Sequence, residues 1–188
     1  MSATTEFGSD DRDLVARIVA YNDTRAFGIL VGRHQSQIRN FLRKLTRDEQ
    51  LADDLSQDTF IHAWDKIAGY KGTGSVIGWL LKVAYTTFLQ SKRKSRRYDE
   101  ILQEVGTTEA VMAERTVSDR HEVSDLDRLL AVLDEEERAV MIMSYACGLS
   151  HREISEATGQ PVGTVKSIIF RGKEKIRQRF EIQSHQHG

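Results

Sequence analysis

Apolar residues recur along most of this chain at the three- and four-residue spacing of amphipathic helices. In the N-terminal half the pattern predicts four helices, over about residues 11–21, 24–45, 48–68 and 76–94, with Thr24 as the cap of the second. The segment Gly69–Ser75 contains three glycines and predicts a loop before the fourth helix. We expect these helices to form one compact domain over residues 11–97.

The pattern weakens over residues 98–124, where acids, Ser and Thr replace large apolar side chains. This composition predicts a flexible acidic linker, with a transient helix near Ala110–Arg115. Helical spacing resumes near Asp125 and predicts a helix over about 126–133 and a second over 135–146, with Ala146 in its core. Residues 1–10 and 181–188 are expected to be polar tails. The predicted fold is all-α, with two small helical domains joined by the linker.

The segment from about Asp134 to Phe180 carries the signals of a helix-turn-helix. Ser150 and Glu153 have the spacing of a capping box, Gly159 suits a left-handed helix end, and Pro161 suits the start of the next helix. That next helix is basic, and its first residues would lie nearest the bases in a DNA major groove. The candidate DNA-binding residues are Thr164, Lys166, Ser167, Arg171, Lys173 and Lys175. A structural αα-hairpin with a solvated basic face is the alternative.

Charge is unevenly distributed, although the formal net charge is only −1. Six acids and no Lys or Arg lie between Asp48 and Asp65, and six basic residues and no acid lie between Lys82 and Arg97. Residues 98–127 are acidic again, and residues 161–180 are basic. This alternation favours separate acidic and basic binding surfaces.

The other polar residues give no support for catalysis or for a resident cofactor. Cys147 is the single cysteine, and none of the six histidines has metal-ligand spacing. No nucleophile–base pairing or nucleotide-binding motif occurs. The N-terminus lacks signal-peptide features, and no apolar run approaches the length of a membrane span. We expect a cytoplasmic, non-enzymatic protein without metal, cofactor or membrane insertion.

Two groups of motifs resemble the small extracytoplasmic-function sigma factors, group four of the bacterial sigma-70 family. Four segments are similar to region two of this family: Gln-Asp-Thr-Phe-Ile-His-Ala-Trp at 57–64, the acidic segment before it, the glycine loop, and the basic segment at 92–97. Three further segments are similar to region four: Leu133–Arg138, Gly148–Ser150 and Pro-Val-Gly-Thr-Val-Lys-Ser at 161–167. The resemblance covers roughly residues 24–97 and 125–180.

The resemblance implies a transcription initiation factor that binds core RNA polymerase and directs it to promoter DNA. Polymerase would be contacted by Asp53, Asp54, Gln57 and Asp58. Region two would recognise and open the −10 element through Tyr70, Lys71, Ser75, Trp79, Lys82, Thr86, Lys92, Arg93 and Lys94. The helix-turn-helix would recognise the −35 element. Regulation by an anti-sigma protein is also implied.

Two positions depart from the family pattern. Tyr85-Thr86 stands where many members have Arg-Asn, and Lys166-Ser-Ile-Ile169 stands where many have Lys-Ser-Arg-Leu. Base preferences at the two promoter elements therefore cannot be transferred to this chain. Two other interpretations remain open: a helix-turn-helix regulator whose N-terminal domain senses a signal or partner, and an interaction protein that binds polymerase without recognising DNA.

Overall fold

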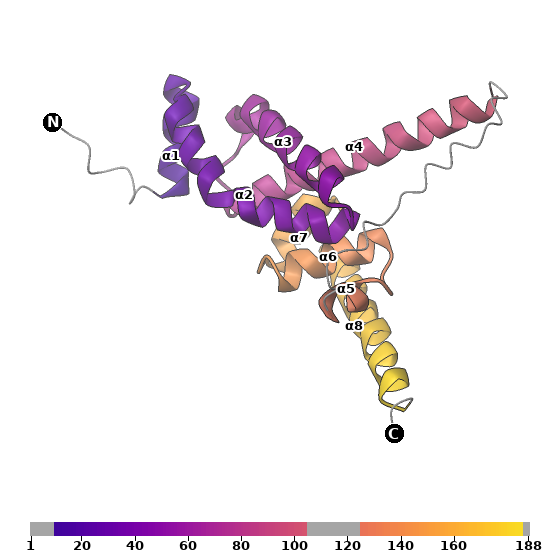
Figure 1. Cartoon of the computed structure of the whole chain (residues 1–188). Helices are drawn as coiled ribbons and strands as arrows, with labels where there is room; N and C mark the ends of the chain where they lie inside the picture. Colours follow the sequence, from indigo (N-terminus) through magenta and orange to yellow (C-terminus); the bar gives the residue numbers. More distant parts are fainter. Residues whose placement is uncertain (1–9, 105–124, 186–188) are drawn as a thin grey trace.

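The computed structural model describes residues 10–104 and 125–185, and these residues form helices without any strand (Figure 1). The N-terminal group comprises α1 (Asp11–Tyr21), α2 (Thr24–Thr46), α3 (Glu49–Lys66), the 3-10 turn η1 (Ile67–Gly69) and α4 (Val76–Glu104). The C-terminal group comprises α5 (Asp125–Leu130), α6 (Glu135–Tyr145), α7 (His151–Thr158) and α8 (Val162–His185). The expected all-α class is confirmed.

The N-terminal group is held together by the apolar faces of its helices. Leu30, Phe41 and Leu80 are almost completely buried, and full burial of such a side chain stabilises a fold by about 1.5–3 kcal/mol. The rings of Phe27 and Trp64 meet edge to face at 5.0 Å between α2 and α3. This packing fixes the helices on either side of the glycine loop.

The cap of α2 is Asp23, and the prediction of Thr24 is wrong. The Asp23 carboxylate accepts hydrogen bonds from the amides of Arg25 at 3.1 Å and Ala26 at 3.0 Å, so Thr24 is already the first helical residue. The same carboxylate pairs with Arg17 of α1 at 2.8 Å. The Ala26 amide and then the Arg17 guanidinium lower the pKa of Asp23. One acid therefore starts α2 and ties it to α1.

Helix α4 continues beyond its predicted end at Lys94. Residues 98–104 contain no Gly or Pro and carry Tyr98, Ile101 and Leu102 at helical spacing, so nothing in this segment stops the helix. The first part of the predicted linker is therefore helical, and it projects from the molecule (Figure 1). Residues 1–9, 105–124 and 186–188, including the helix expected near Ala110–Arg115, lie outside the described residues.

The predicted helix-turn-helix signals are confirmed. Ser150 and Glu153 form a capping box at the start of α7, and Gly159 ends that helix at φ 76°. A second capping box, which the sequence pattern did not predict, starts α6 with Asp134 and Glu137. Ala146 is exposed rather than buried, because α6 ends at Tyr145. Helix α8 continues to His185, into the segment predicted as a polar tail.

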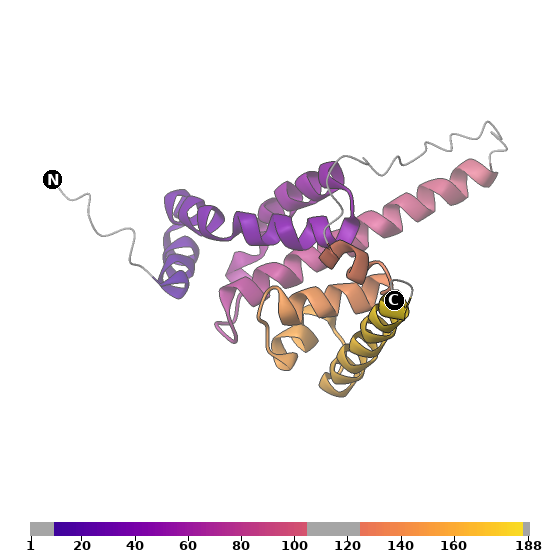
Figure 2. The same ribbon diagram turned by 60° about the horizontal axis from the view of Figure 1, so that its bottom comes forward.

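The two helical groups lie against each other, with α7 beside the start of α4 and α6 beside α2 (Figure 2). Arg138 of α6 connects them. Its buried guanidinium donates to the carbonyls of Leu130 at 3.1 Å and Leu133 at 2.9 Å, and across the boundary to that of Leu45 at 3.2 Å. Burial lowers the pKa of Arg138, and Arg47 nearby lowers it further. The side chain thus anchors α6 to the end of α2.

Candidate nucleic-acid and polymerase interfaces

The glycine loop between η1 and α4 has a defined conformation. Gly72 at φ 70° and Gly74 at φ 74° adopt the left-handed backbone that glycine tolerates best. The Tyr70 hydroxyl donates to the Gly74 carbonyl at 3.1 Å, and the Tyr70 ring lies 5.8 Å from the ring of Trp79. The hydroxyl of Ser75 accepts from the Gly78 amide at 3.1 Å and caps α4. The loop therefore presents an aromatic pair beside polar groups.

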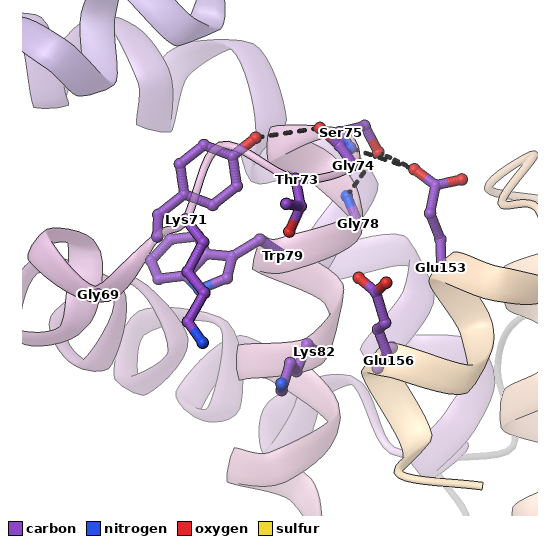
Figure 3. A pocket seen from close by; sticks show the side chains of 12 residues that line it. Gly69, Lys71, Thr73, Gly74, Ser75, Gly78, Trp79, Lys82, Glu153 and Glu156 are labelled. Atoms are coloured by element: carbon purple, nitrogen blue, oxygen red, sulfur yellow. Dashed lines mark hydrogen bonds between the residues drawn. The ribbon is translucent and has the colours of Figure 1, made fainter. Parts of the chain in front are cut away.

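A cavity of about 360 Å³ opens between this loop, the first turns of α4 and helix α7 (Figure 3). Its walls include Tyr70, Lys71, Trp79 and Lys82 of the N-terminal group, together with Glu153 and Glu156 of α7. Aromatic rings beside lysines suit a nucleic-acid base and its phosphate. The carboxylates of Glu153 and Glu156 are unfavourable for such a ligand, because they repel phosphate. The predicted −10 residues thus meet an acidic wall.

The basic side of α4 also meets the C-terminal group. Arg93 and Lys94 are exposed, whereas the Lys92 ammonium lies 2.6 Å from the Glu135 carboxylate of α6. The Thr86 hydroxyl donates to the carbonyl of Lys82, one turn earlier, at 2.8 Å. Most of the predicted −10 residues therefore line one stretch from the loop along α4.

Tyr85, which stands where many family members have Arg, has a structural role. The side chain is 6% exposed, and its ring stacks on that of Phe88 at 6.3 Å. Burial raises the pKa of Tyr85, and the acids at the start of α6, led by Glu136, raise it further. Tyr85 therefore belongs to the packed interior beside α6.

The four predicted polymerase-binding residues share one face of α3. Asp54, Gln57 and Asp58 are exposed. Asp53 is held by Arg39 of α2, whose guanidinium donates to both carboxylate oxygens, including Nη2 to Oδ2 at 2.9 Å. This hydrogen bonding lowers the pKa of Asp53. No sequence pattern indicated Arg39, because the pair joins two helices that meet only in the folded chain.

Helix α8 separates a buried face from an exposed one. Val165, Ile168 and Ile169 are buried, whereas Lys166, Ser167 and Arg171 are exposed and Thr164 is half-buried. Ile168, at the position where many family members have Arg, is only 1% exposed. At this position the chain therefore has a core residue in place of the basic side chain of many family members.

Phe170 was missed by the sequence analysis. It is 67% exposed and lies one turn after Lys166, beside Arg171. Since Ile168 and Ile169 occupy the inward positions, Phe170 must point outward, and this spacing could have revealed it. An exposed ring on the helix predicted to contact DNA suits contact with a thymine methyl group.

Two predicted DNA-binding lysines have partners within the C-terminal group. The Lys175 ammonium lies 2.7 Å and 2.6 Å from the two carboxylate oxygens of Glu137, whose side chain is 6% exposed. The Lys173 ammonium lies 5.3 Å from the centre of the Tyr145 ring, a cation–π geometry. These contacts join α8 to α6.

The structure also bears on metal ions, membranes and the cysteine. The described ranges 10–104 and 125–185 contain no group of three or more His, Cys, Asp and Glu side chains arranged to hold a metal ion. Within the same residues, every helix is too short or too polar to cross a membrane. Burial raises the pKa of the Cys147 thiol to about 11, so the reactive thiolate is disfavoured.

Comparison with known proteins defines the class. The sigma-70 region 2 family model matches residues 30–98, and the sigma-70 region 4 model matches residues 124–176. The order of these two regions is that of a sigma factor of the sigma-70 family. It argues against a regulator with an unrelated sensory domain and against a protein that only binds polymerase.

Two relatives place the chain within that class. The ECF RNA polymerase sigma factor RpoE of Cereibacter sphaeroides is 30% identical over 177 residues, covering 92% of this chain and 97% of the relative. The ECF RNA polymerase sigma-E factor of Haemophilus influenzae is 29% identical over 182 residues, covering 91% and 95%. The chain belongs to the extracytoplasmic-function sigma factors, as its motifs predicted, and is a transcription initiation factor.

Solved structures agree on the fold. The sigma factor RpoE of Bartonella quintana, in complex with the anti-sigma factor NepR, has a TM-score of 0.67 at 22% identity, covering 83% of this chain and 97% of that one. CnrH, in complex with the cytosolic domain of CnrY, has a TM-score of 0.66 at 24% identity, covering 92% and 97%.

Proposed function

We propose that the chain divides promoter recognition between its two helical groups while α3 docks on core RNA polymerase. The supporting observation is the presence of two distinct surfaces suited to DNA, the aromatic and basic loop that leads into α4 and the exposed basic face of α8. On this assignment the first recognises and opens the −10 element, and the second recognises the −35 element. The domains correspond to residues 11–97 and 125–180.

The polymerase contact is assigned to Asp53, Asp54, Gln57 and Asp58. An acidic patch accelerates encounter with a basic partner surface and fixes the register of docking. Arg39 holds the Asp53 carboxylate in one orientation through two hydrogen bonds. We assign Arg39 as a positioning residue for this contact.

The −35 contact is assigned to Thr164, Lys166, Ser167, Phe170 and Arg171. Polar side chains at the start of a recognition helix reach base edges, and Phe170 supplies an apolar contact for a thymine methyl. Lys173 lies further along α8, where phosphate contacts contribute affinity without sequence information. Lys175 is assigned to packing, because Glu137 already binds it.

The −10 contact is assigned to the loop and α4. Tyr70 and Trp79 offer stacking surfaces for an unpaired base, with Lys71, Ser75, Lys82 and Thr86 around them. The tract Lys92–Lys94 would follow the phosphates. Unstacking a base costs only a few kcal/mol, a cost that stacking on aromatic rings can offset.

We further propose that the chain catalyses no reaction itself and acts in the cytoplasm beside its polymerase. The solved relative RpoE binds the anti-sigma factor NepR. A protein inhibitor of that class is our proposal for this chain, and its expected target is the pair of polymerase-binding surfaces.

The test is promoter selection by the reconstituted holoenzyme from random DNA. Initiation from sites with two conserved, regularly spaced elements is expected. Selection repeated with Phe170→Ala should relax one thymine position of the upstream element, whereas Arg128→Ala, an exposed change on α5, should select the same sites as the wild type. Specific duplex binding without core polymerase, combined with no initiation in its presence, would contradict the proposal.

A further inference from the structure

Glu153 joins the two helical groups at the starts of α7 and α4. One carboxylate oxygen accepts hydrogen bonds from the Ser150 amide at 3.0 Å and hydroxyl at 2.8 Å. The other accepts from the Ser75 amide at 3.2 Å and hydroxyl at 2.5 Å (Figure 3). Burial alone would raise the pKa of Glu153, but these hydrogen bonds outweigh it and hold the pKa below its ordinary value. The bridging group is therefore a carboxylate anion.

This anion occupies polar groups of the −10 surface. The start of a helix favours negative charge, because its free amides and its dipole point toward the ligand. Here the Glu153 carboxylate accepts hydrogen bonds from the amide and hydroxyl of Ser75, at the start of α4. The helices also approach closely at Gly78, where an added Cβ would come within 3.3 Å of the Glu153 carboxylate and 3.7 Å of Leu149. A DNA strand would have to displace α7 to reach Ser75.

Two further carboxylates of the C-terminal group face the same surface. Glu135 pairs with Lys92 at 2.6 Å, and Glu156 stands in the wall of the cavity that Lys82 also lines. The acids at the start of α6 also raise the pKa of Tyr85 in the middle of α4, so this end of α6 lies near that helix. Carboxylates thus line the predicted path of the DNA from the loop to the basic tract.

We infer that the free protein is autoinhibited by its own C-terminal group, whose α6–α7 face covers the −10 surface with carboxylates in the place of promoter phosphates. This inference rests on the proposed function of the glycine loop and α4. Exposed ion pairs contribute little stability, so the closed state is one that a binding partner can open. Core polymerase, by engaging the two groups apart, would select the open state.

The test compares the full-length chain with Glu153→Gln and with the double variant Glu135→Gln/Glu153→Gln. Glutamine at 153 keeps a capping box for α7, because Gln also serves at that position. Glu174→Gln is the matched control, since Glu174 pairs with Arg177 on α8, away from the loop. Binding of a short, labelled single-stranded DNA of random sequence is measured by fluorescence anisotropy. Initiation by each holoenzyme is measured in parallel.

The double variant should bind single-stranded DNA about tenfold more tightly than the wild type, as expected for losing charge-assisted contacts. The single variant should lie between them, and Glu174→Gln should match the wild type. Equal binding by the wild type and the double variant, including no binding by either, would overturn the inference. So would an equal gain in Glu174→Gln, because it would reflect net charge alone. Failure of the wild-type holoenzyme to initiate would instead reject the proposed function.

Discussion

The two surfaces proposed to recognise promoter DNA differ in access. Helix α8 presents Lys166, Phe170 and Arg171 to solvent, whereas the loop and α4 face carboxylates of α6 and α7. Both surfaces are basic, so composition does not separate them. The difference arises because the domain that carries the open surface also covers the other one. Separation of the two groups would expose the −10 surface and leave α8 unchanged.

A pair of lysines shows the same difference on a smaller scale. Lys175 and Lys92 were both predicted to contact DNA, and each meets a carboxylate at 2.6 Å. Glu137, the partner of Lys175, is buried within the same group. Glu135, the partner of Lys92, is half exposed and belongs to the other group. The first pair is part of the fold, and the second can open.

The largest effect should come from replacing Arg138, which anchors α6 to the end of α2. Arg138→Met would remove the guanidinium donor from three carbonyls, of which that of Leu130 still accepts from the Leu133 amide at 3.3 Å, so we expect the free energy of unfolding to fall by about 3 kcal/mol. Urea unfolding followed by circular dichroism measures this change. Arg177→Met, at an exposed site on α8, is the control and should change stability by less than about 0.5 kcal/mol. Similar stabilities for both variants would show that Arg138 is no anchor.

The exposed surface of α8 should bind promoter DNA less tightly when a base contact is removed. Arg171→Ala should weaken holoenzyme binding to the selected upstream element by about 2 kcal/mol, because a guanidinium contact to a base edge is lost. Electrophoretic mobility shift with duplexes that carry or lack that element measures the loss. Equal weakening on both duplexes would assign Arg171 to phosphate rather than to base recognition.

Substitution of Lys175 should lower the stability of the protein more than substitution of Lys92. Lys175→Met leaves a buried carboxylate without its partner and should cost about 2 kcal/mol of unfolding free energy. Lys92→Met breaks an exposed pair and should cost less than about 1 kcal/mol. Thermal unfolding of both variants tests this order. If Lys92→Met were the more destabilising change, the distinction between the two pairs would be wrong.

The smallest effect should be a dependence on pH at Glu153. Its pKa is lowered in the folded protein, so its contribution is complete above the ordinary value of 4.5 and is lost as pH falls through the folded value. The stability advantage of the wild type over Glu153→Gln should therefore shrink below about pH 4.5, by about 1 kcal/mol at most for a partly exposed group. Urea unfolding of both proteins across this range measures it. A constant difference would show that the Ser75 contact does not hold the carboxylate.

Local patterns in the sequence predicted much of the fold. The apolar spacing located the helices, and the capping box at Ser150 and the turn at Gly159 were confirmed. Asp23 was missed as a cap because it is adjacent to Thr24, which has an equally suitable side chain. The end of α4 was missed because the many acids, Ser and Thr of residues 98–124 suggested a linker, although nothing in residues 98–104 breaks a helix.

The candidate sites were less predictable where they depend on contacts between distant segments. The spacing of Ser150 and Glu153 predicts the cap of α7, and it contains no information about Ser75, which lies 78 residues away from Glu153. Arg39 and Asp53 meet only when α2 packs on α3. Tertiary packing decides these cases.

Hydrogen–deuterium exchange of the free chain is the most direct measurement of the difference in access. In the wild type, the amides of Ser75 and Gly78 should be protected, because each donates to an oxygen that the closed arrangement holds in place. In the double variant Glu135→Gln/Glu153→Gln, both amides should exchange faster, while α8 from Val165 to Ile169 keeps the wild-type rate. Exchange at Ser75 that is fast in the wild type and unchanged in the variant would contradict the account.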